Sequence, residues 1–200
     1  MNAAAHYRAD PRTTSFTPIG STWRWVFTVV AVLSVAGFVG AVALWTGAIV
    51  SNPERPDTRL FDAGGIVLLV TILCVYVQAF VGMAWIHSAW SWLPWDQRYS
   101  RHWRSWISPG QAALMLLIPY FQYYWMFVIN LGLCDALERL RVRYPTRDAA
   151  PKNLALVACI MQMIIPLPVG MILWVLFMNK VEGMSREMSA AAVTRAHRPF

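Results

Sequence analysis

Four amide side chains lie inside the long apolar runs of this sequence. Gln78, Gln122 and Gln162 fall near the middle of the second, third and fourth runs, and Asn130 lies further along the third run. An amide both donates and accepts hydrogen bonds, so these groups either bind across helices or line a polar pathway or ligand pocket. The sequence favours cross-helix packing, and a pathway or pocket beside the proline-rich break in the fourth run is the alternative.

Signatures of catalysis are missing from the sequence. It contains no phosphate-binding glycine motif, no H-E-x-x-H and no G-x-S-x-G, and no Asp, Glu, Lys or Arg occupies the central part of an apolar run. Cys74, Cys134 and Cys159 form no C-x-x-C pair that would hold a metal. We therefore expect a protein that is not an enzyme and that has no cofactor or metal site. Ion-coupled transport is also disfavoured, because it usually needs ionisable groups within the membrane.

A segment rich in Trp and Arg separates the second and third runs. Read as a helix, it places Trp95, Trp103 and Trp106 on one face with Tyr99, and it places Arg98, Arg101 and Arg104 on the other. This pattern predicts a helix lying in the lipid-headgroup layer, with its rings at the acyl boundary and its guanidinium groups on phosphates. A loop with scattered Trp and Arg is the alternative.

A stripe of small residues follows the first apolar run. Ala36, Gly40, Ala43 and Gly47 recur at i, i+4, i+7 and i+11, which places them on one narrow face of a helix. Another backbone can approach such a face closely. The stripe predicts a helix-packing face, used either within the chain or between copies of it.

The elements that carry these residues are long apolar runs. The chain is 58% hydrophobic and 14% charged, whereas soluble domains have about 45–50% and 25%. No core of a 200-residue chain absorbs that excess, because small domains leave much of their surface exposed. The sequence predicts an all-α integral membrane protein whose transmembrane domain covers 23–182 between polar tails at 1–22 and 183–200. Four spanning helices are expected, at about 23–50, 63–92, 109–144 and 152–182.

Local signals mark where two of these helices begin or break. Ser108, Pro109 and Gln111 have the pattern of a capping box and predict the start of the third helix. The motif from Pro166 through Pro168 to Gly170 predicts that the fourth helix is kinked or broken there. A fourth segment that turns back at this motif and re-enters without crossing is the alternative.

The charge distribution predicts the orientation. The net charge is +7, from 17 Lys and Arg against 10 Asp and Glu. With four crossings, most basic residues lie on the side of the termini, so both termini are expected in the cytoplasm. The basic cluster from Arg139 to Lys152 opposes this orientation, and reporters at Ala149 and Phe200 are expected on opposite sides. Basic residues confined to short segments between apolar runs predict contact with membrane lipids and no nucleic-acid partner.

Several short motifs in the second half of the chain are distinctive. They are Ser108-Pro-Gly-Gln-Ala112, Ile118-Pro119, Tyr124-Trp125, Ile165-Pro166 and Leu176-Phe-Met-Asn-Lys180. In these motifs the chain resembles a group of uncharacterised bacterial multipass membrane proteins with a four-helix domain of unknown function. The resemblance implies the bacterial cytoplasmic (inner) membrane and four crossings, and it carries over no active-site residue.

These observations favour a non-enzymatic multi-pass membrane protein. Its expected role is a helix-packing, scaffold or accessory subunit, with membrane lipids and other transmembrane helices as partners. A homo-oligomeric pore or carrier for ions or small solutes is the alternative, because of the amides and the broken fourth helix. An enzyme acting on lipid headgroups ranks last, since the sequence offers no base or metal cluster for it.

Overall fold

The structure, a computed structural model, describes residues 17–51, 54, 57–164 and 169–196. Nearly all regular structure in these residues is helical. The α-helices are α1 (Thr22–Ser51), α2 (Thr58–Trp92), α3 (Pro109–Leu114), α4 (Phe121–Arg143), α5 (Lys152–Ile164) and α6 (Val169–Ala196). Short 3-10 helices, η2 (Trp95–Gln97) and η3 (Met115–Leu117), and two strands, β1 (Tyr99–Ser100) and β2 (Ser105–Trp106), complete the fold.

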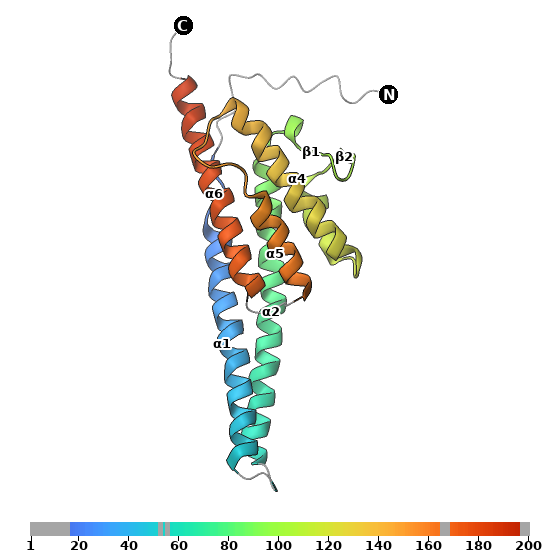
Figure 1. The fold of residues 1–200 in the computed structure, drawn as a ribbon, viewed down its shortest axis with the longest axis vertical. Helices are drawn as coiled ribbons and strands as arrows, with labels where there is room; N and C mark the ends of the chain where they lie inside the picture. The colour runs from blue at the N-terminus through green and yellow to red at the C-terminus, as the bar shows by residue number, and fades with distance from the viewer. Residues whose placement is uncertain (1–16, 52–53, 55–56, 165–168, 197–200) are drawn as a thin grey trace.

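Helices α1 and α2 form a long antiparallel hairpin that extends beyond the other helices (Figure 1). Both are long and apolar enough to cross a membrane, as the first two predicted spans required. Helix α2 begins earlier than expected because the Asp57 carboxylate accepts hydrogen bonds from the amides of Arg59 and Leu60. We call the free part of the hairpin, Gly37–Ser51 with Thr58–Thr71, the stem.

Small residues let α1 and α2 approach closely. The buried positions of α1 in and near the stem are Ala31, Ser34, Ala41 and Ala48. Gly37 lies against Thr71 so closely that a Cβ at residue 37 would collide with the Thr71 hydroxyl oxygen. Gly64 of α2 lies equally close to the Trp45 ring, whose Nε1 donates to the Phe61 carbonyl at 3.1 Å. The contact therefore depends on residues without a side chain at the crossing points.

The predicted single helix at 109–144 is wrong, because the chain reverses within it. Trp125 Nε1 donates to the Ala112 carbonyl at 3.0 Å, whereas an unbroken helix would separate these residues by about 20 Å. The start at Ser108 is confirmed, since its hydroxyl accepts from the Gln111 amide at 3.1 Å. The reversal occurs at Tyr120, which has a φ of 61°, and the Phe121 amide donates back to the Pro119 carbonyl. This is a γ-turn, a strained conformation for a residue other than glycine.

The fourth predicted helix is also divided into a hairpin. Helix α5 ends at Ile164 and α6 begins at Val169, and the two pack side by side (Figure 1). The Asp148 carboxylate before α5 pairs with Lys180 of α6 at 2.7 Å, so by its middle α6 has returned to the level where α5 begins. The described residues therefore contain two helices that are long and apolar enough to cross a membrane, and four spanning helices are not confirmed. Their architecture is one long hairpin and two shorter ones, and we call the shorter pair the collar.

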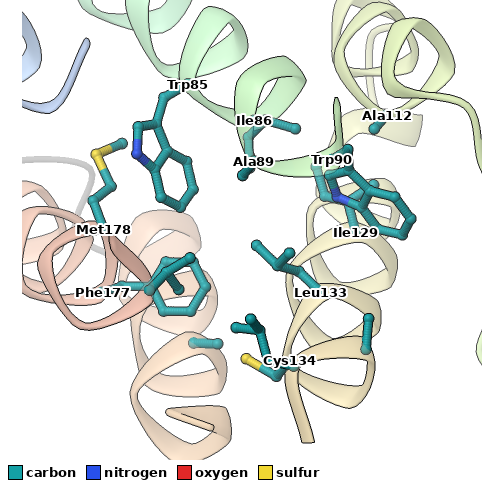
Figure 2. Packing of buried hydrophobic residues seen from close by; sticks show 14 of the residues in the cluster. Trp85, Ile86, Ala89, Trp90, Ala112, Ile129, Leu133, Cys134, Phe177 and Met178 are labelled. Carbon is teal, nitrogen blue, oxygen red and sulfur yellow. The ribbon is translucent and has the colours of Figure 1, made fainter. Parts of the chain in front are cut away.

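The core lies where the collar packs around the upper half of α2. Figure 2 shows Trp85 of α2 beside Met178 and Phe177 of α6, with Ile129 and Leu133 of α4 facing the same interior. The Trp85 and Phe177 rings meet edge to face with centroids 5.9 Å apart. Large side chains thus fill the collar, in contrast to the small residues of the stem.

Candidate functional site

A cavity of about 810 Å³ lies where α2 meets the two collar hairpins. All four amides singled out in the sequence line it: Gln78 from α2, Gln122 and Asn130 from α4, and Gln162 from α5. The remaining lining is apolar or aromatic apart from Thr71, and consists of Phe27, Phe38, Leu68, Ile72, Val75, Tyr76, Ala79, Phe80, Gly82, Met83, Ile86, Leu116, Leu117, Met126, Ile129, Met171, Trp174 and Met178. Since these residues come from distant parts of the chain, only the tertiary fold creates the site.

Helix α2 supplies one wall. Thr71 and Gln78 lie on the same helical face, and the Thr71 hydroxyl is occupied by the Val67 carbonyl at 2.8 Å. Gln78 is only 4% exposed, and its Oε1 has no hydrogen-bond partner among the described residues. The face of α2 that contacts α1 in the stem therefore presents a polar group without a hydrogen-bond partner, the Gln78 oxygen, where it reaches the cavity.

Asn130 of α4 supplies a second unpaired oxygen. The residue is fully buried, and its Nδ2 donates to the Met126 carbonyl at 2.7 Å. This bond fixes the orientation of the amide, because a flip would place its oxygen against another carbonyl oxygen. The Oδ1 atom then has no partner in the described part of the chain. A buried carbonyl left unpaired costs about 1–3 kcal/mol, so the site calls for a hydrogen-bond donor.

The other two amides lie near the ends of the collar hairpins. Gln122 is in the first turn of α4, just after the γ-turn at Tyr120, and Gln162 is in the last turn of α5. Both are half-buried. Gly170, in the first turn of α6, is buried, whereas Pro166 and Pro168 of the predicted helix break lie outside the described residues. Each hairpin thus brings an amide to the cavity from near its reversal.

The chemistry available in this lining is hydrogen bonding and apolar contact. No charged side chain lines the cavity, and the described residues contain no group of three or more His, Cys, Asp or Glu that could hold a metal ion. A cavity of several hundred Å³ with a few placed polar groups is typical of a small-molecule binding site. The arrangement therefore fits binding.

Sequence reasoning missed a buried carboxylate near this site. Glu182 of α6 is fully buried, and its Oε2 accepts from Arg24 Nε at 2.8 Å while its Oε1 accepts from Trp85 Nε1 at 3.1 Å. The available signal was a Glu directly after an apolar run, followed by Ser185, which accepts from the Ile19 amide. This cluster ties α1, α2 and α6 together one turn from Met178 of the cavity lining.

The predicted interfacial helix over Trp95–Trp106 is wrong, because this segment forms η2 and a two-stranded hairpin. Tyr99 pairs with Trp106 across antiparallel β1 and β2, and the Trp95 and Trp106 rings stack with centroids 5.6 Å apart. Arg104, in the turn, has a φ of 53°. The exposed tryptophans thus stack on each other through strand pairing instead of lining a helical face.

The side chains of this segment also separate into two groups. Arg98 turns inward and donates to the carbonyls of Ser91 and Leu93 at 3.0 and 2.9 Å. These bonds provide partners for carbonyl groups at the C-terminal end of α2. Burial of this guanidinium lowers the pKa of Arg98. Trp103 packs edge to face on Trp125, with centroids 5.1 Å apart. Arg101 and Arg104 remain exposed with Trp95 and Trp106, so the predicted contact with lipid headgroups narrows to this part of the hairpin.

The predicted small-residue stripe does not form the main contact within the chain. Ala36, Ala43 and Gly47 are exposed, and Gly40 is half-buried with Val67 as its nearest neighbour on α2. The face that contacts α2 lies beside this stripe, through Ser34, Gly37 and Ala41. Both faces carry small residues, and periodicity alone did not separate them. Use of the stripe between chains stays a prediction.

Comparison with known proteins adds no functional assignment. A scan against protein-family models, a search of curated proteins and a search of solved structures each found no match to this chain. The amide-lined cavity is therefore the feature from which a function has to be argued.

Proposed function

We propose that this protein crosses the bilayer with α1 and α2 and inserts both collar hairpins part-way from one side. Helices of 30 and 35 residues extend about 45 and 52 Å, enough for a hydrocarbon core of about 30 Å. Helix α5, with 13 residues, extends only about 20 Å. The apolar parts of α4, before Asp135, and of α6, before Glu182, have a similar length. All these collar segments are too short to cross.

The exposure of the long helices supports this proposal. Only 22% of the most apolar stretch of α1 and 17% of that of α2 is buried. A core helix of a soluble protein would be mostly covered, whereas Val39, Val50, Ile66 and Leu69 are each more than half exposed. Lipid is the solvent that tolerates such a surface.

If the hairpins are only partly inserted, the basic residues also no longer disagree about which side of the membrane is cytoplasmic. Ion pairs and hydrogen bonds join the ends of the collar helices to one another, so every described Lys and Arg except Arg59 gathers near the end of the molecule where α1 begins. The basic cluster from Arg139 to Lys152 then supports the same orientation as the rest. The proposed location is the bacterial cytoplasmic membrane, with both termini and this basic end in the cytoplasm.

Short epitope tags test this topology. We expect tags inserted at Ala149 and after Arg195 to be accessible from the same side, and a tag beside Arg59 to be accessible from the other. This expectation replaces the opposite-side arrangement that four crossings imply. Tags at Ala149 and Arg195 on opposite sides would show that the α5–α6 hairpin crosses the membrane.

Within this arrangement, the proposed function is non-enzymatic binding of an apolar molecule taken from the bilayer. The supporting observation is the convergence of four amides from three helices on one otherwise apolar cavity, with two buried oxygens unpaired. Such a protein would act as a carrier or holder of its ligand. A water-filled pore is disfavoured, since an apolar lining of this kind favours dewetting.

A filling substitution tests occupancy of the cavity. The full chain would be placed in nanodiscs with a diazirine-bearing hexadecane, irradiated, and examined by mass spectrometry for labels on Ile86 and Ile129, which are buried lining residues. We expect labelling in the wild type and a severalfold loss in Ala79→Trp, whose ring would occupy the cavity. Ala43→Trp, on the exposed face of α1, is the matched control. Equal labelling of all three proteins, or none on Ile86 and Ile129, would rule out this function.

A scaffold or accessory subunit remains the second candidate, favoured by the uncovered stem. The exposed Ala36, Ala43 and Gly47 offer a partner helix a close approach, and nothing within the described chain covers them. Crosslinking between chains in membranes would test it. We expect Gly47→Leu to abolish such crosslinks if the stripe is an interface, and to leave cavity labelling unchanged.

A further inference from the structure

The unpaired atoms of the cavity specify more than its shape. Gln78 Oε1 and Asn130 Oδ1 are both acceptors, they come from different helices, and neither has a donor among the described residues. One N–H of Asn130 Nδ2 already donates to the Met126 carbonyl, and Oδ1 is the atom of that amide left without a partner. A ligand that satisfies these atoms has to bring O–H or N–H groups.

The rest of the lining specifies the charge of the ligand. No Lys, Arg, Asp or Glu lines the cavity. A carboxylate or ammonium group in such surroundings would lose its hydration without gaining a counter-charge. A neutral polar group loses much less, and two charge-free acceptors compensate it. The cavity therefore selects an uncharged donor.

The mouth of the cavity specifies where the apolar part of the ligand lies. Phe38 of α1 with Ile72, Tyr76 and Phe80 of α2 both line the cavity and are exposed on the outer surface. In the proposed membrane arrangement these side chains face hydrocarbon. A ligand whose tail extends through this opening keeps its polar end on Gln78 and Asn130 and its chain in lipid.

We infer that the cavity binds a neutral, single-chain amphiphile whose polar end is a hydrogen-bond donor, as in a long-chain alcohol. This inference rests on the proposed function, because it assumes an occupied cavity in a membrane. The hydroxyl group donates its single proton to Gln78 Oε1, because Gln78 keeps 4% of its surface exposed whereas Asn130 keeps none. Gln122 and Gln162, which carry both donors and acceptors, complete the polar surroundings.

Competition among matched ligands tests the donor requirement. Hexadecanol, its methyl ether and hexadecanoate would compete with the diazirine-bearing hexadecane for labelling of Ile86 and Ile129 in wild-type nanodiscs. The ether retains the oxygen and the chain but has no O–H. We expect hexadecanol to compete at a concentration roughly five- to tenfold lower than the ether, the usual worth of one hydrogen bond. Hexadecanoate, measured at neutral pH, is expected to be the weakest of the three.

A variant of nearly the same shape supplies an independent readout. Gln78→Met removes the unpaired oxygen, so we expect the advantage of hexadecanol over the ether to fall severalfold. The ligand-free variant should also melt about 2–4 °C higher, because a buried unsatisfied group is gone. Val77→Met, next to Gln78 along α2 but exposed and outside the lining, should alter neither quantity.

The outcomes separate the inference from the function on which it rests. Absence of cavity labelling in the wild type overturns the proposed function. Labelling that hexadecanol and its ether suppress at equal concentrations leaves that function in place and overturns the donor requirement. A Gln78→Met protein that melts lower than the wild type would show that Oε1 has a partner, and would overturn the inference as well.

Discussion

The helices of the stem and those of the collar pack against one another by different means. In the stem, Gly37 and Gly64 remove side chains so that two backbones meet. In the collar, large side chains such as Trp85 and Phe177 fill the interior. The buried Glu182 carboxylate, bound to Arg24 and Trp85, ties three helices together. The two helices of the stem are therefore closely packed at these glycines, whereas the collar leaves a space that amides line. Close contact between two backbones therefore requires small residues on α2, whereas a ligand-sized cavity requires larger side chains around it on the same helix.

The largest expected effect comes from breaking the collar at its ion pair. Arg24→Met leaves the buried Glu182 carboxylate without its closest cation, and removal of one partner of such a pair costs about 3–5 kcal/mol. We expect a large loss of thermal stability in detergent. The double variant Arg24→Met with Glu182→Met should recover most of it, since both charges are then absent. A single variant as stable as the wild type would show that Arg186, 3.6 Å from Glu182, is a sufficient partner.

The next effect separates the two faces of α1 in the stem. Gly37→Ala places a methyl group against Thr71, whose hydroxyl is held by Val67, so the helices must move apart. Overpacking of this kind costs about 1–3 kcal/mol. Gly47→Ala meets nothing within 4 Å and is the matched control. Unfolding in SDS should distinguish the two variants, and equal stabilities would contradict the close contact described for the stem.

A smaller effect is expected at the reversal between α3 and α4. Tyr120 has a φ of 61° and is 87% exposed, so its side chain contributes little packing while its backbone is strained. Tyr120→Gly should raise stability by about 1 kcal/mol, because glycine adopts this conformation without a Cβ conflict. Tyr123→Gly, at an exposed position inside α4, is the control and should lower stability. A loss of stability in both variants would indicate that Tyr120 is anchored by its ring.

The smallest effect concerns the connection between α4 and α5. The hydrogen bond from the Ala150 amide, followed by Arg141, lowers the pKa of Glu138, and Lys180 lowers that of Asp148. A carboxyl with a depressed folded pKa stabilises the fold above its ordinary value, 4.5 for Glu138 and 3.8 for Asp148, and the contribution is lost as the pH falls. Both groups are exposed, so the change should be local. After correction for the intrinsic exchange rate at each pH, the protection of amides at 144–151 should fall below these values, while protection in the middle of α6 stays high.

Asp148→Asn provides the control for that measurement. It removes one of the two carboxylates, so part of the loss of protection should be present at neutral pH. Protection at 144–151 that stays constant with pH in the wild type would show that these pairs do not hold the connection.

Much of the local structure was predictable from particular residues. Ser108 capped the third predicted helix as expected, and the apolar runs near 23–50 and 63–92 became α1 and α2. The reversal at Tyr120 was missed because Ile118 and Pro119 lie inside an apolar run, where hydropathy continues unchanged through a turn. The Trp95–Trp106 segment was assigned to a helix because a 3.6-residue period and a stacked strand pair can place the same rings together.

The sequence by itself determined which segments are apolar along their length and which polar groups are available for binding. Uninterrupted apolar residues made α1 and α2 long, and Gln78, Gln122, Asn130 and Gln162 were recognisable as amides in apolar surroundings. Only the tertiary structure decided that these amides share one cavity, and that Glu182 finds Arg24 across the chain. Periodicity and hydropathy describe residues within a few turns of one helix. The reversals of the two hairpins, in contrast, decide which side chains that are distant in sequence come into contact.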